Sequence, residues 1–597
     1  MANQVVPQTY PFESPSRSVI DLSGIWHIAF DFDELGEDEF AKSDVIPTEA
    51  KCVAVPGSYN DQFTEKAIRD FIGQVWYYRR ICIPRDTGQR YFLRFASANY
   101  SAKVYLAGKC IGGHDGGHLP FTLAIPDEFA GCDVLLAVMV DNNLSLETIP
   151  PGIRKDYTIE EHGFAMKKLE YQFDFFHYSG LNRRVHLVSA PKTFTADATI
   201  VTKEISDGKA ILSYELDIAG VYDSISISLS CPGKDSVVVE NANASGKITI
   251  DNPLLWRVGQ GGLYDFTVKL HAGGEVIDEM AERIGIRTVA VEGDKFLVNG
   301  EEVYFKGFGR HEDFLITGRN IPDAVLIRDF ELMKWIGANS FRTSHYPYSE
   351  ETMLLADEMG FMVIDETPAV GLQRWGQWDA GWFDSDLANK HTLAQHCSCL
   401  TELIHRDKNR PCVVMWSVAN EAATGDVKAR SYFKTLVDLT RKLDPTRPVT
   451  NVLFTGVDKE NTIDMFDVIC LNRYVSWYFC SGDIEAVPKL LGEELQRYHD
   501  KYNMPILLSE FGADTIEGAH HLPARQFSEE YQSEFLAAYF DVFDSLSFII
   551  GEHVWNFADF MTKQEPGRAV GNRKGLFTRD RQPKLAAHTT RQRWNKQ

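Results

Sequence analysis

The chain has 597 residues, of which 44% are hydrophobic and 24% are charged, proportions typical of a soluble globular protein. The length is sufficient for about three or four domains. The formal net charge of −23 argues against nucleic acid and anionic membranes as partners, because both carry negative charge and would be repelled.

The N-terminus carries no basic segment followed by an apolar core, and no apolar run in the sequence is long enough to span a membrane. We therefore expect no signal peptide, no membrane partner and a cytoplasmic location. The 10 cysteines are scattered, and their one close pair, Cys397 and Cys399, has no second cluster of cysteine or histidine at metal-ligand spacing. We expect neither a metal nor an organic cofactor.

Residues 1–188 contain strand-like runs, such as DLSGIWHIAFDF and DVLLAVMVDNN, which are broken by turns rich in Gly, Pro and Asn. Many strands without an intervening helical period are typical of a β-sandwich or jelly roll. Residues 189–288 continue with shorter alternating runs, including SISISLSC, and this length suits an immunoglobulin-like β-sandwich. No low-complexity linker separates the two parts, so we expect them to pack together.

From residue 289 to residue 597 the pattern changes to strands that alternate with helices. Predicted helices over residues 323–336, 391–406 and 528–545 each precede an apolar strand-like run. Eight strands in eight helix-separated positions predict a TIM (β/α)8 barrel. The alternative, a doubly wound open sheet, would need a Gly-rich phosphate loop after its first strand, and the sequence there is GFGRHED.

Two apolar runs of this region end on a carboxylate. Residues 413–418 stop at Asn420 and Glu421, and residues 506–509 lead directly into Glu510. A buried carboxylate is costly to desolvate, so two of them on separate strands need a reason. In a parallel barrel the carboxyl ends of the strands open into the active-site mouth. We therefore predict that Glu421 and Glu510 face each other across a sugar.

Two carboxylates about 5 to 5.5 Å apart are sufficient for glycoside hydrolysis with retention of configuration. One protonates the leaving oxygen and the other attacks the anomeric carbon, so the attacking group must stay ionised, beside donors such as Tyr474 or Arg342. The local sequence does not tell which glutamate has which role. Taken singly, Glu421 or Glu510 could equally be a structural partner of an arginine.

The residues and motifs resemble a known family. The order of sandwich, immunoglobulin-like domain and barrel is similar to that of glycoside hydrolase family 2 and covers the whole chain. Within it, the sequence resembles the bacterial, gut-type β-glucuronidases at GFGRHED, RTSHYPY, VIDE, MWSVANE, LNRYVSWY, SEFG, VWNFADF and GNRKGLFTRDRQPK, which occur in the same order.

This resemblance implies that Glu421 is the acid/base and that Glu510 is the nucleophile. It also implies that Asn420 binds the 2-hydroxyl of the sugar. Asp174, in FDFFHYSG near the end of the first domain, would reach into the barrel mouth to hold sugar hydroxyls. The other residues expected to line the pocket are His345, Asn472, Tyr474, Tyr478 and Trp555.

A glucuronide differs from a glucoside by a carboxylate at C6, and its recognition needs a cation and a donor. In an extended loop, residues 572 and 574 point to one side and residue 573 points away. By resemblance, Asn572 and Lys574 form this uronate clamp, with Arg568 as a helper. The alternative is a solvated basic turn. A local clamp would overcome the repulsion between an anionic substrate and an acidic protein.

The sequence departs from the family at Ala422, where the family has a proline, and this leaves the backbone after Glu421 less constrained. After the third barrel strand, Trp375, Trp378 and Trp382 predict an apolar surface for the aglycone or a contact with a neighbouring subunit. Relatives of this kind imply a homo-oligomer, either a tetramer or a dimer.

Other functions stay open. A β-galactosidase or β-mannosidase would keep the mechanism and change the sugar, whereas a β-galacturonidase would also keep the substrate carboxylate, so the clamp does not exclude it. A non-catalytic sugar-binding protein would have no need of a paired acid and nucleophile.

Overall fold

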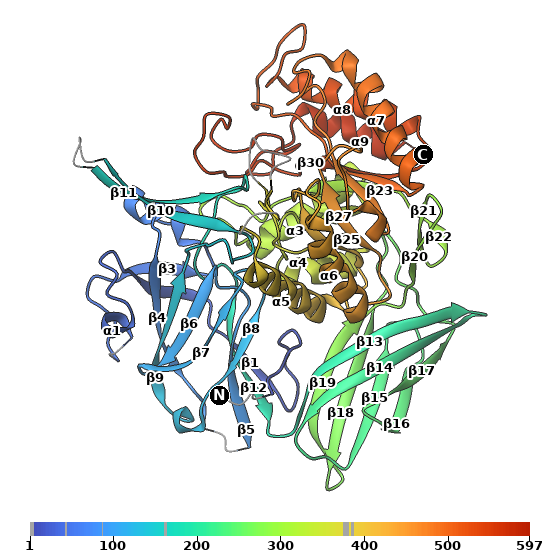
Figure 1. Ribbon diagram of the computed structural model, residues 1–597. Coiled ribbons are helices and arrows are strands. Elements are labelled where there is room, and N and C mark those ends of the chain that lie inside the picture. The colour runs from blue at the N-terminus through green and yellow to red at the C-terminus, as the bar shows by residue number, and fades with distance from the viewer. Residues whose placement is uncertain are drawn as a thin grey trace.

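The computed structural model describes residues 5–41, 44–85, 88–159, 164–373, 381–383 and 387–596. Figure 1 shows a β-sandwich at the N-terminus, a second and smaller sandwich, and a barrel with which both are in contact. The sequence prediction of this architecture is confirmed.

The N-terminal sandwich consists of two antiparallel sheets whose facing apolar side chains form one core. Trp26, Tyr77 and Val138 lie in that core and are fully buried. One sheet has the order β1 (Ser18–Asp21), β12 (Val185–Pro191), β5 (Gln89–Phe95) and β8 (Phe121–Ala124). The other has the order β3 (Lys51–Val55), β2 (Gly24–Phe30), β4 (Gln74–Cys82), β9 (Asp133–Asp141), β6 (Ser101–Leu106) and β7 (Lys109–Asp115), and the short helices are α1 (Glu37–Phe40) and α2 (Lys66–Arg69).

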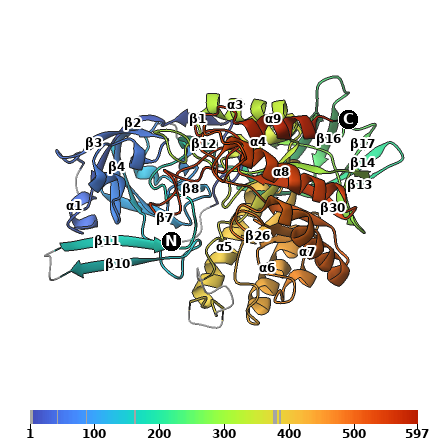
Figure 2. The same cartoon turned by 90° about the horizontal axis from the view of Figure 1, so that it is seen from above.

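A two-stranded ribbon, β10 (Gly152–Ile159) and β11 (Phe164–Tyr171), projects from this sandwich, as Figures 1 and 2 show. The chain that leaves β11 turns towards the barrel. There Phe175 forms an isolated β-bridge with Thr562, and the backbone N–H of Phe176 donates to the carbonyl of Met561 at 2.9 Å. These backbone bonds fix the end of the sandwich against a loop of the barrel.

The second sandwich is immunoglobulin-like, with alternating side chains along its strands. In the strand SISISLS, Ile225, Ile227 and Leu229 are buried and their neighbours are partly exposed, the period of two that a half-buried strand requires. One sheet has the order β13 (Phe194–Ser206), β14 (Lys209–Ala219) and β17 (Ser245–Asp251). The other has the order β16 (Val237–Ala242), β15 (Ser224–Ser230), β18 (Tyr264–Ala272) and β19 (Glu275–Ile284).

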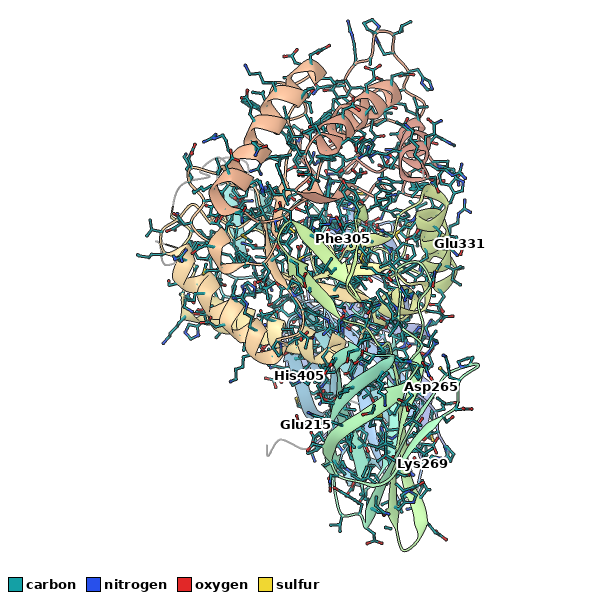
Figure 3. The ribbon with its side chains drawn as sticks, turned by 90° about the vertical axis from the view of Figure 1, so that its right-hand side faces the viewer. Glu215, Asp265, Lys269, Phe305, Glu331 and His405 are labelled. Atoms are coloured by element: carbon teal, nitrogen blue, oxygen red, sulfur yellow. The ribbon has the colours of Figure 1, made fainter. Side chains whose placement is uncertain are left out.

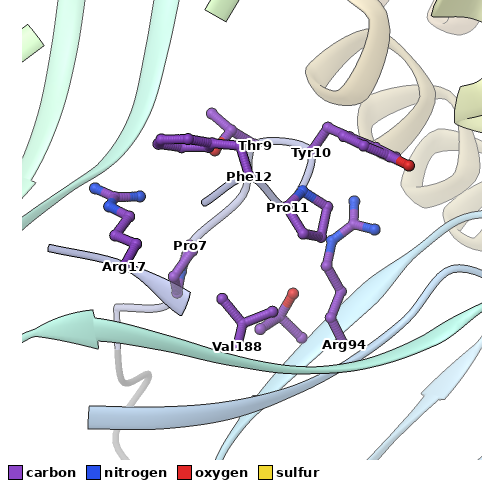
Figure 4. Close-up of a pocket in the computed structure, with 9 residues that line it drawn as sticks. Pro7, Thr9, Tyr10, Pro11, Phe12, Arg17, Arg94 and Val188 are labelled. Carbon is purple, nitrogen blue, oxygen red and sulfur yellow. The ribbon is translucent and has the colours of Figure 1, made fainter. Parts of the chain in front are cut away.

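The N-terminal segment connects the parts, and Figure 4 shows it passing between Arg17 and Arg94. Arg17 forms a buried ion pair with Asp278 of the second sandwich at 2.7 Å. Arg94 forms a buried pair with Glu350 of the barrel at 2.8 Å. The space beneath the segment is only about 10 Å³ and is therefore packing rather than a binding site.

The barrel is closed and its neighbouring strands are parallel. Its strands follow in chain order: β23 (Phe305–Gly309), β24 (Ser340–Arg342), β25 (Met362–Glu366), β26 (Val413–Asn420), β27 (Val449–Leu453), β28 (Ile469–Asn472), β29 (Ile506–Glu510) and β30 (Ile549–Trp555). The helices between and after them are α3 (Asp323–Ile336), α4 (Glu350–Met359), α5 (Lys390–Asp407), α6 (Ala429–Leu443), α7 (Val487–Tyr502), α8 (Glu529–Asp544) and α9 (Leu585–Trp594), and a small sheet of β20 (Val289–Glu292), β21 (Lys295–Val298) and β22 (Glu301–Glu302) precedes the barrel.

Every residue of β26 and β29 is buried, which explains why the sequence carries continuous apolar runs there instead of an alternating pattern. In Figure 3, Phe305 lies among the barrel strands near the middle of the view, and Asp265 and Lys269 lie below it on the immunoglobulin-like sheet. Because the barrel strands are parallel, their carboxyl ends lie on one side of the barrel, and the polar residues that follow the strands meet there.

Trp256, in the loop before β18, connects the second sandwich to the barrel. Its side chain is fully buried in the barrel's apolar cluster, and its indole N–H donates to the carbonyl of Asp357 at 2.8 Å.

Replacing Trp256 by Ala should destabilise the protein by about 3–5 kcal/mol because it leaves a large cavity and an unpaired carbonyl. Thermal denaturation measures this, with Trp256→Phe as the milder control; an unchanged Tm for Trp256→Ala would contradict the proposed role of this contact.

Candidate active site

A cavity of about 470 Å³ lies at the carboxyl ends of the barrel strands. Its wall combines residues from β26, β28, β29 and β30 with the segment that follows β11 and with the loop after β30. The residues that line it are Gln172, Phe173, Asp174, His345, Val370, Gln373, Asn420, Glu421, Phe454, Asn472, Tyr474, Tyr478, Glu510, Trp555, Glu565, Gly567, Arg568 and Asn572.

Glu421 follows the last residue of β26 and has a backbone φ of 49°, in the left-handed region that a non-glycine residue adopts at a cost of about 1–3 kcal/mol. Its backbone N–H donates to the carbonyl of Val452 at 2.8 Å, which holds this conformation. The carboxylate accepts a hydrogen bond from Nδ2 of Asn472 at 2.8 Å. Burial raises the pKa of Glu421, and the charge of Glu366 adds to the increase. Glu421 is thus set up to carry a proton.

Glu510, the last residue of β29, has different partners. It accepts from Nη2 of Arg342 at 2.5 Å and from the hydroxyl of Tyr474 at 2.7 Å, and Nε2 of His345 lies 3.7 Å from the same carboxylate. Burial raises the pKa of Glu510, and the Arg342 guanidinium is the strongest influence in the opposite direction. A cation and a hydroxyl that both donate to this carboxylate stabilise its ionised form.

Arg342 is fully buried and lies between two carboxylates. Its Nη1 donates to both oxygens of Glu366, at 2.8 and 2.9 Å, while its Nη2 donates to Glu510. Glu366 also contacts Nδ1 of His345 at 3.0 Å and accepts from Ser417 at 2.8 Å. The position of the Glu510 carboxylate is therefore fixed by a network that begins at Glu366.

The amides and rings complete the wall. Nδ2 of Asn472 lies 3.2 Å from Oδ1 of Asn420, so these two amides are oriented by each other and by Glu421. Trp555 stacks on His345 with ring centroids 5.0 Å apart and an interplanar angle of 16°. A Cβ at Gly309 would lie 2.5 Å from the Trp555 ring, which explains why glycine occupies this position. This apolar face with adjacent amides suits a sugar ring.

A cluster of charges forms another side of the cavity. Asp174 accepts from Nε of Arg568 at 2.9 Å and from Nδ2 of Asn572 at 2.8 Å, so the sandwich and the barrel loop meet here. Nη2 of Arg568 donates to the hydroxyl of Tyr478 at 3.1 Å. Tyr478 is 59% exposed and forms part of the rim of the site.

Lys574 belongs to the same cluster but does not itself line the cavity. It is 1% exposed and its ammonium forms an ion pair with Asp514. It also donates to the hydroxyl of Tyr478 at 3.0 Å and lies 5.0 Å from the centroid of the Trp477 ring. Its charge therefore reaches the cavity through Tyr478 and the adjacent Arg568.

The sequence analysis did not identify every residue of this site. It omitted Asp514, and it omitted lining residues that come from elsewhere in the fold: Gln172, Phe173, Val370, Gln373, Phe454, Glu565 and Gly567. Asp514 had one available signal, since it follows Glu510 by four residues in the same strand-end loop. Gln172 and Phe173 follow β11, so they reach the cavity only because the sandwich packs against the barrel, whereas the other five lie in loops that follow β25, β27 and β30.

The prediction for the tryptophan-rich segment is wrong at Trp382. Its side chain is buried, 4% exposed, so it packs inside the chain and offers no surface to an aglycone or a subunit. Trp375 and Trp378 lie outside the described residues. Ala422, which replaces the expected proline, is fully buried and precedes Ala423, whose N–H donates to the carbonyl of Leu372 at 3.0 Å.

Within the described ranges, no group of three or more His, Cys, Asp or Glu side chains is arranged to hold a metal ion. Among those same residues, no helix is both long and apolar enough to cross a membrane.

A parallel barrel whose mouth holds two carboxylates with unlike donors, beside amides and an aromatic wall, defines the class of glycoside hydrolases. Profiles of glycosyl hydrolases family 2 match the chain throughout: the sugar binding domain over residues 19–191, the family 2 domain over residues 185–287 and the TIM barrel domain over residues 289–597. The chain belongs to glycosyl hydrolase family 2.

Several relatives in this family are similar over their full length. A β-glucuronidase of Paenibacillus borealis is 43% identical, with 98% of each chain covered. The solved structure of a β-D-glucuronidase of Dictyoglomus thermophilum superposes with a TM-score of 0.93 at 42% identity over 99% of both chains. A β-glucuronidase of Ruminococcus gnavus, solved in complex with D-glucaro 1,5-lactone, gives a TM-score of 0.93 at 37% identity over 99% of this chain and 100% of that chain.

Proposed function

We propose that the protein is a retaining β-glucuronidase that hydrolyses β-D-glucuronide conjugates by double displacement. The observation that carries the proposal is one cavity that contains two carboxylates with different donors and, on another side, a cluster with two cationic side chains. The relatives support it, since those that match over the full chain are named β-glucuronidases.

In the first step, the ionised Glu510 attacks the anomeric carbon while Glu421 donates its proton to the leaving oxygen. The glycosidic bond breaks, the aglycone leaves as a neutral alcohol or phenol, and a glycosyl ester forms on Glu510. In the second step, Glu421 takes a proton from water, whose oxygen attacks the same carbon and releases Glu510 as a carboxylate. Arg342 and Tyr474 stabilise the carboxylate before attack and after release.

The rest of the cavity would position the sugar. Asn420 would bind the 2-hydroxyl, Asp174 would accept from other hydroxyls, and His345, Asn472 and Trp555 would hold the ring. The C6 carboxylate would meet the clamp of Asn572 and Lys574, with Arg568 and Tyr478 beside them. All steps use side chains of the chain itself, so the proposed mechanism needs no metal or organic cofactor.

A panel of aryl β-D-glycosides tests this function, with glucuronide, galacturonide, glucoside and galactoside measured under identical conditions. We expect the glucuronide to have the highest kcat/KM, because the clamp has no partner on the neutral sugars. A preference for galacturonide would indicate the β-galacturonidase alternative, and a preference for galactoside would indicate a β-galactosidase. Ligand binding without product release would indicate a non-catalytic sugar-binding protein.

Glu366 gives a prediction on pH dependence. The acid form of Glu421 is required, so kcat/KM should fall as the pH rises through the pKa of Glu421, which Glu366 raises through its charge. Replacing Glu366 by Gln removes this charge, and the basic limb of the profile should shift to lower pH. The variant should also lose stability, by about 3–5 kcal/mol, because Arg342 loses a buried partner.

Ser417→Ala is the control for this variant, since Ser417 bonds to Glu366 but carries no charge. It should change the stability slightly and leave the basic limb in place. A Glu366→Gln profile that superposes on that of the wild type would rule out the electrostatic role.

We further propose that the protein acts in the cytoplasm as a homo-oligomer, a tetramer or a dimer, and that its domains span residues 1–188, 189–288 and 289–597. Size-exclusion chromatography with light scattering would determine the oligomeric state, and a monomeric mass at working concentration would refute it.

A further inference from the structure

Asp514 is a buried carboxylate at the edge of the proposed uronate clamp that no step of the mechanism uses. It forms an ion pair with Lys574, and the two side chains are 4% and 1% exposed. It accepts the backbone N–H of Arg573 at 2.7 Å and lies 3.6 Å from Nη1 of Arg568. Burial opposes its charge, but Lys574 and Arg568 lower its pKa below the usual value, so it is ionised at neutral pH.

The charges of the clamp are balanced without a substrate. Arg568 is shared between Asp174 at 2.9 Å and Asp514, and Lys574 pairs with Asp514, so two cations face two carboxylates. Glu565, on the same wall, lies 3.9 Å from Lys563 and 4.0 Å from Nε of Arg568, and together with Lys563 it adds one charge of each sign. A site built only to attract an anion would not contain Asp514.

We propose that Asp514 is a specificity-determining counter-ion, which positions Lys574 and Arg568 and limits how tightly the cavity binds a free carboxylate. This inference rests on the proposed function. The C6 carboxylate is the same in substrate, transition state and product, so additional affinity for it lowers KM without raising kcat. The released sugar acid keeps this carboxylate, and a clamp without Asp514 would retain the product.

The test is Asp514→Asn, which removes one negative charge and keeps the shape and the oxygen that accepts the Arg573 N–H. At low ionic strength, KM for an aryl glucuronide and Ki for D-glucuronate should both fall about ten-fold, because the variant leaves one cation of the clamp without its carboxylate. The Ki for D-glucose, which has no carboxylate, should not change, and kcat on the glucuronide should not rise. Competitive inhibition and isothermal titration calorimetry measure these values.

Asp559→Asn is the matched control. Asp559 is also buried, also pairs with a lysine (Lys584, 2.7 Å) and also accepts a backbone N–H of the same segment (Gly575, 3.0 Å), but its cations are Lys584 and Arg573 instead of the clamp cations Lys574 and Arg568. Its variant should leave the Ki for D-glucuronate as in the wild type. A folded Asp514→Asn whose Ki for D-glucuronate is unchanged or higher would overturn the inference.

If Asp514→Asn does not fold, Asp514→Ser removes the same charge with a smaller group.

The salt dependence of the wild-type enzyme is a second test. If the clamp is neutral, the wild-type Ki for D-glucuronate should vary less than about two-fold between about 20 mM and about 200 mM salt, and a steep loss of affinity with salt would overturn the inference. A wild type without preference for glucuronides would instead refute the proposed function itself. If the wild type prefers glucuronides but Asp514→Asn has the same KM and the same Ki for D-glucuronate as the wild type, only the role of Asp514 would be refuted.

Discussion

Replacing Glu510 by Gln is expected to reduce kcat on an aryl glucuronide by at least about 10⁴-fold, because the variant has no carboxylate to form the glycosyl ester. Replacing Glu421 by Gln should reduce kcat/KM by about 10² to 10⁴-fold, the usual contribution of a general acid. The loss should be smaller for aglycones that leave readily without a proton. Steady-state kinetics with a series of aryl glucuronides of different leaving-group pKa measures both effects.

Glu493→Gln, an exposed change on α7, is the control for these variants and should retain wild-type kinetics. Because Glu510 is bonded to Arg342, its variant leaves a buried cation with one partner fewer, so circular dichroism and thermal denaturation should accompany the kinetics. Near-normal turnover by folded Glu510→Gln would eliminate the proposed mechanism. Restoration of Glu421→Ala by azide, with the β-glycosyl azide of retained configuration as product, would independently locate the acid/base.

Replacing Lys574 by Met is expected to remove the preference for uronides. The variant keeps much of the apolar stem but loses the ammonium, so kcat/KM on the glucuronide should fall by about 10² to 10³-fold, as for the loss of a buried charged partner. Activity on an aryl glucoside should be retained, because a neutral sugar has no carboxylate for the ammonium to bind. Parallel assays on the two substrates measure the ratio.

Lys563→Met is the comparison, since Lys563 lies on the same loop and its charge faces Glu565 rather than Asp514. It should leave the substrate ratio near that of the wild type. A Lys574→Met enzyme that still prefers glucuronide by the original factor would assign recognition of the carboxylate to Arg568 and Asn572 alone.

The sequence predicted the positions of residues correctly where the local hydrophobic pattern by itself determines where a strand lies in the fold. Residues 413–418 and 506–509 have no alternation because both faces of those strands are covered, and a glutamate after such a run has to lie at the barrel mouth. The spacing of Asn572 and Lys574 predicted that both side chains point to one side as a clamp. Asn572 lines the cavity and bonds to Asp174, whereas Lys574 does not line it and bonds to Tyr478, so the clamp stays a prediction.

Contacts between distant segments were outside the reach of that reasoning. The pairing of Lys574 with Asp514 joins residues 60 positions apart, and nothing in either local sequence indicates it. A surface position was wrongly predicted for Trp382, which is buried. A tryptophan in an irregular segment has the same local sequence pattern whether it faces solvent or the core. Gln172 and Phe173 line the cavity because of the backbone bridge between Phe175 and Thr562, which is a feature of how the domains dock.

That bridge has a consequence for protein engineering. A barrel expressed alone would carry both glutamates but lack Asp174, so Asn572 would lose the anion that orients it and Arg568 would keep Asp514 but lose its nearer partner. Transplanting this catalytic module into another scaffold would therefore require residues 172–176 to be transplanted with it.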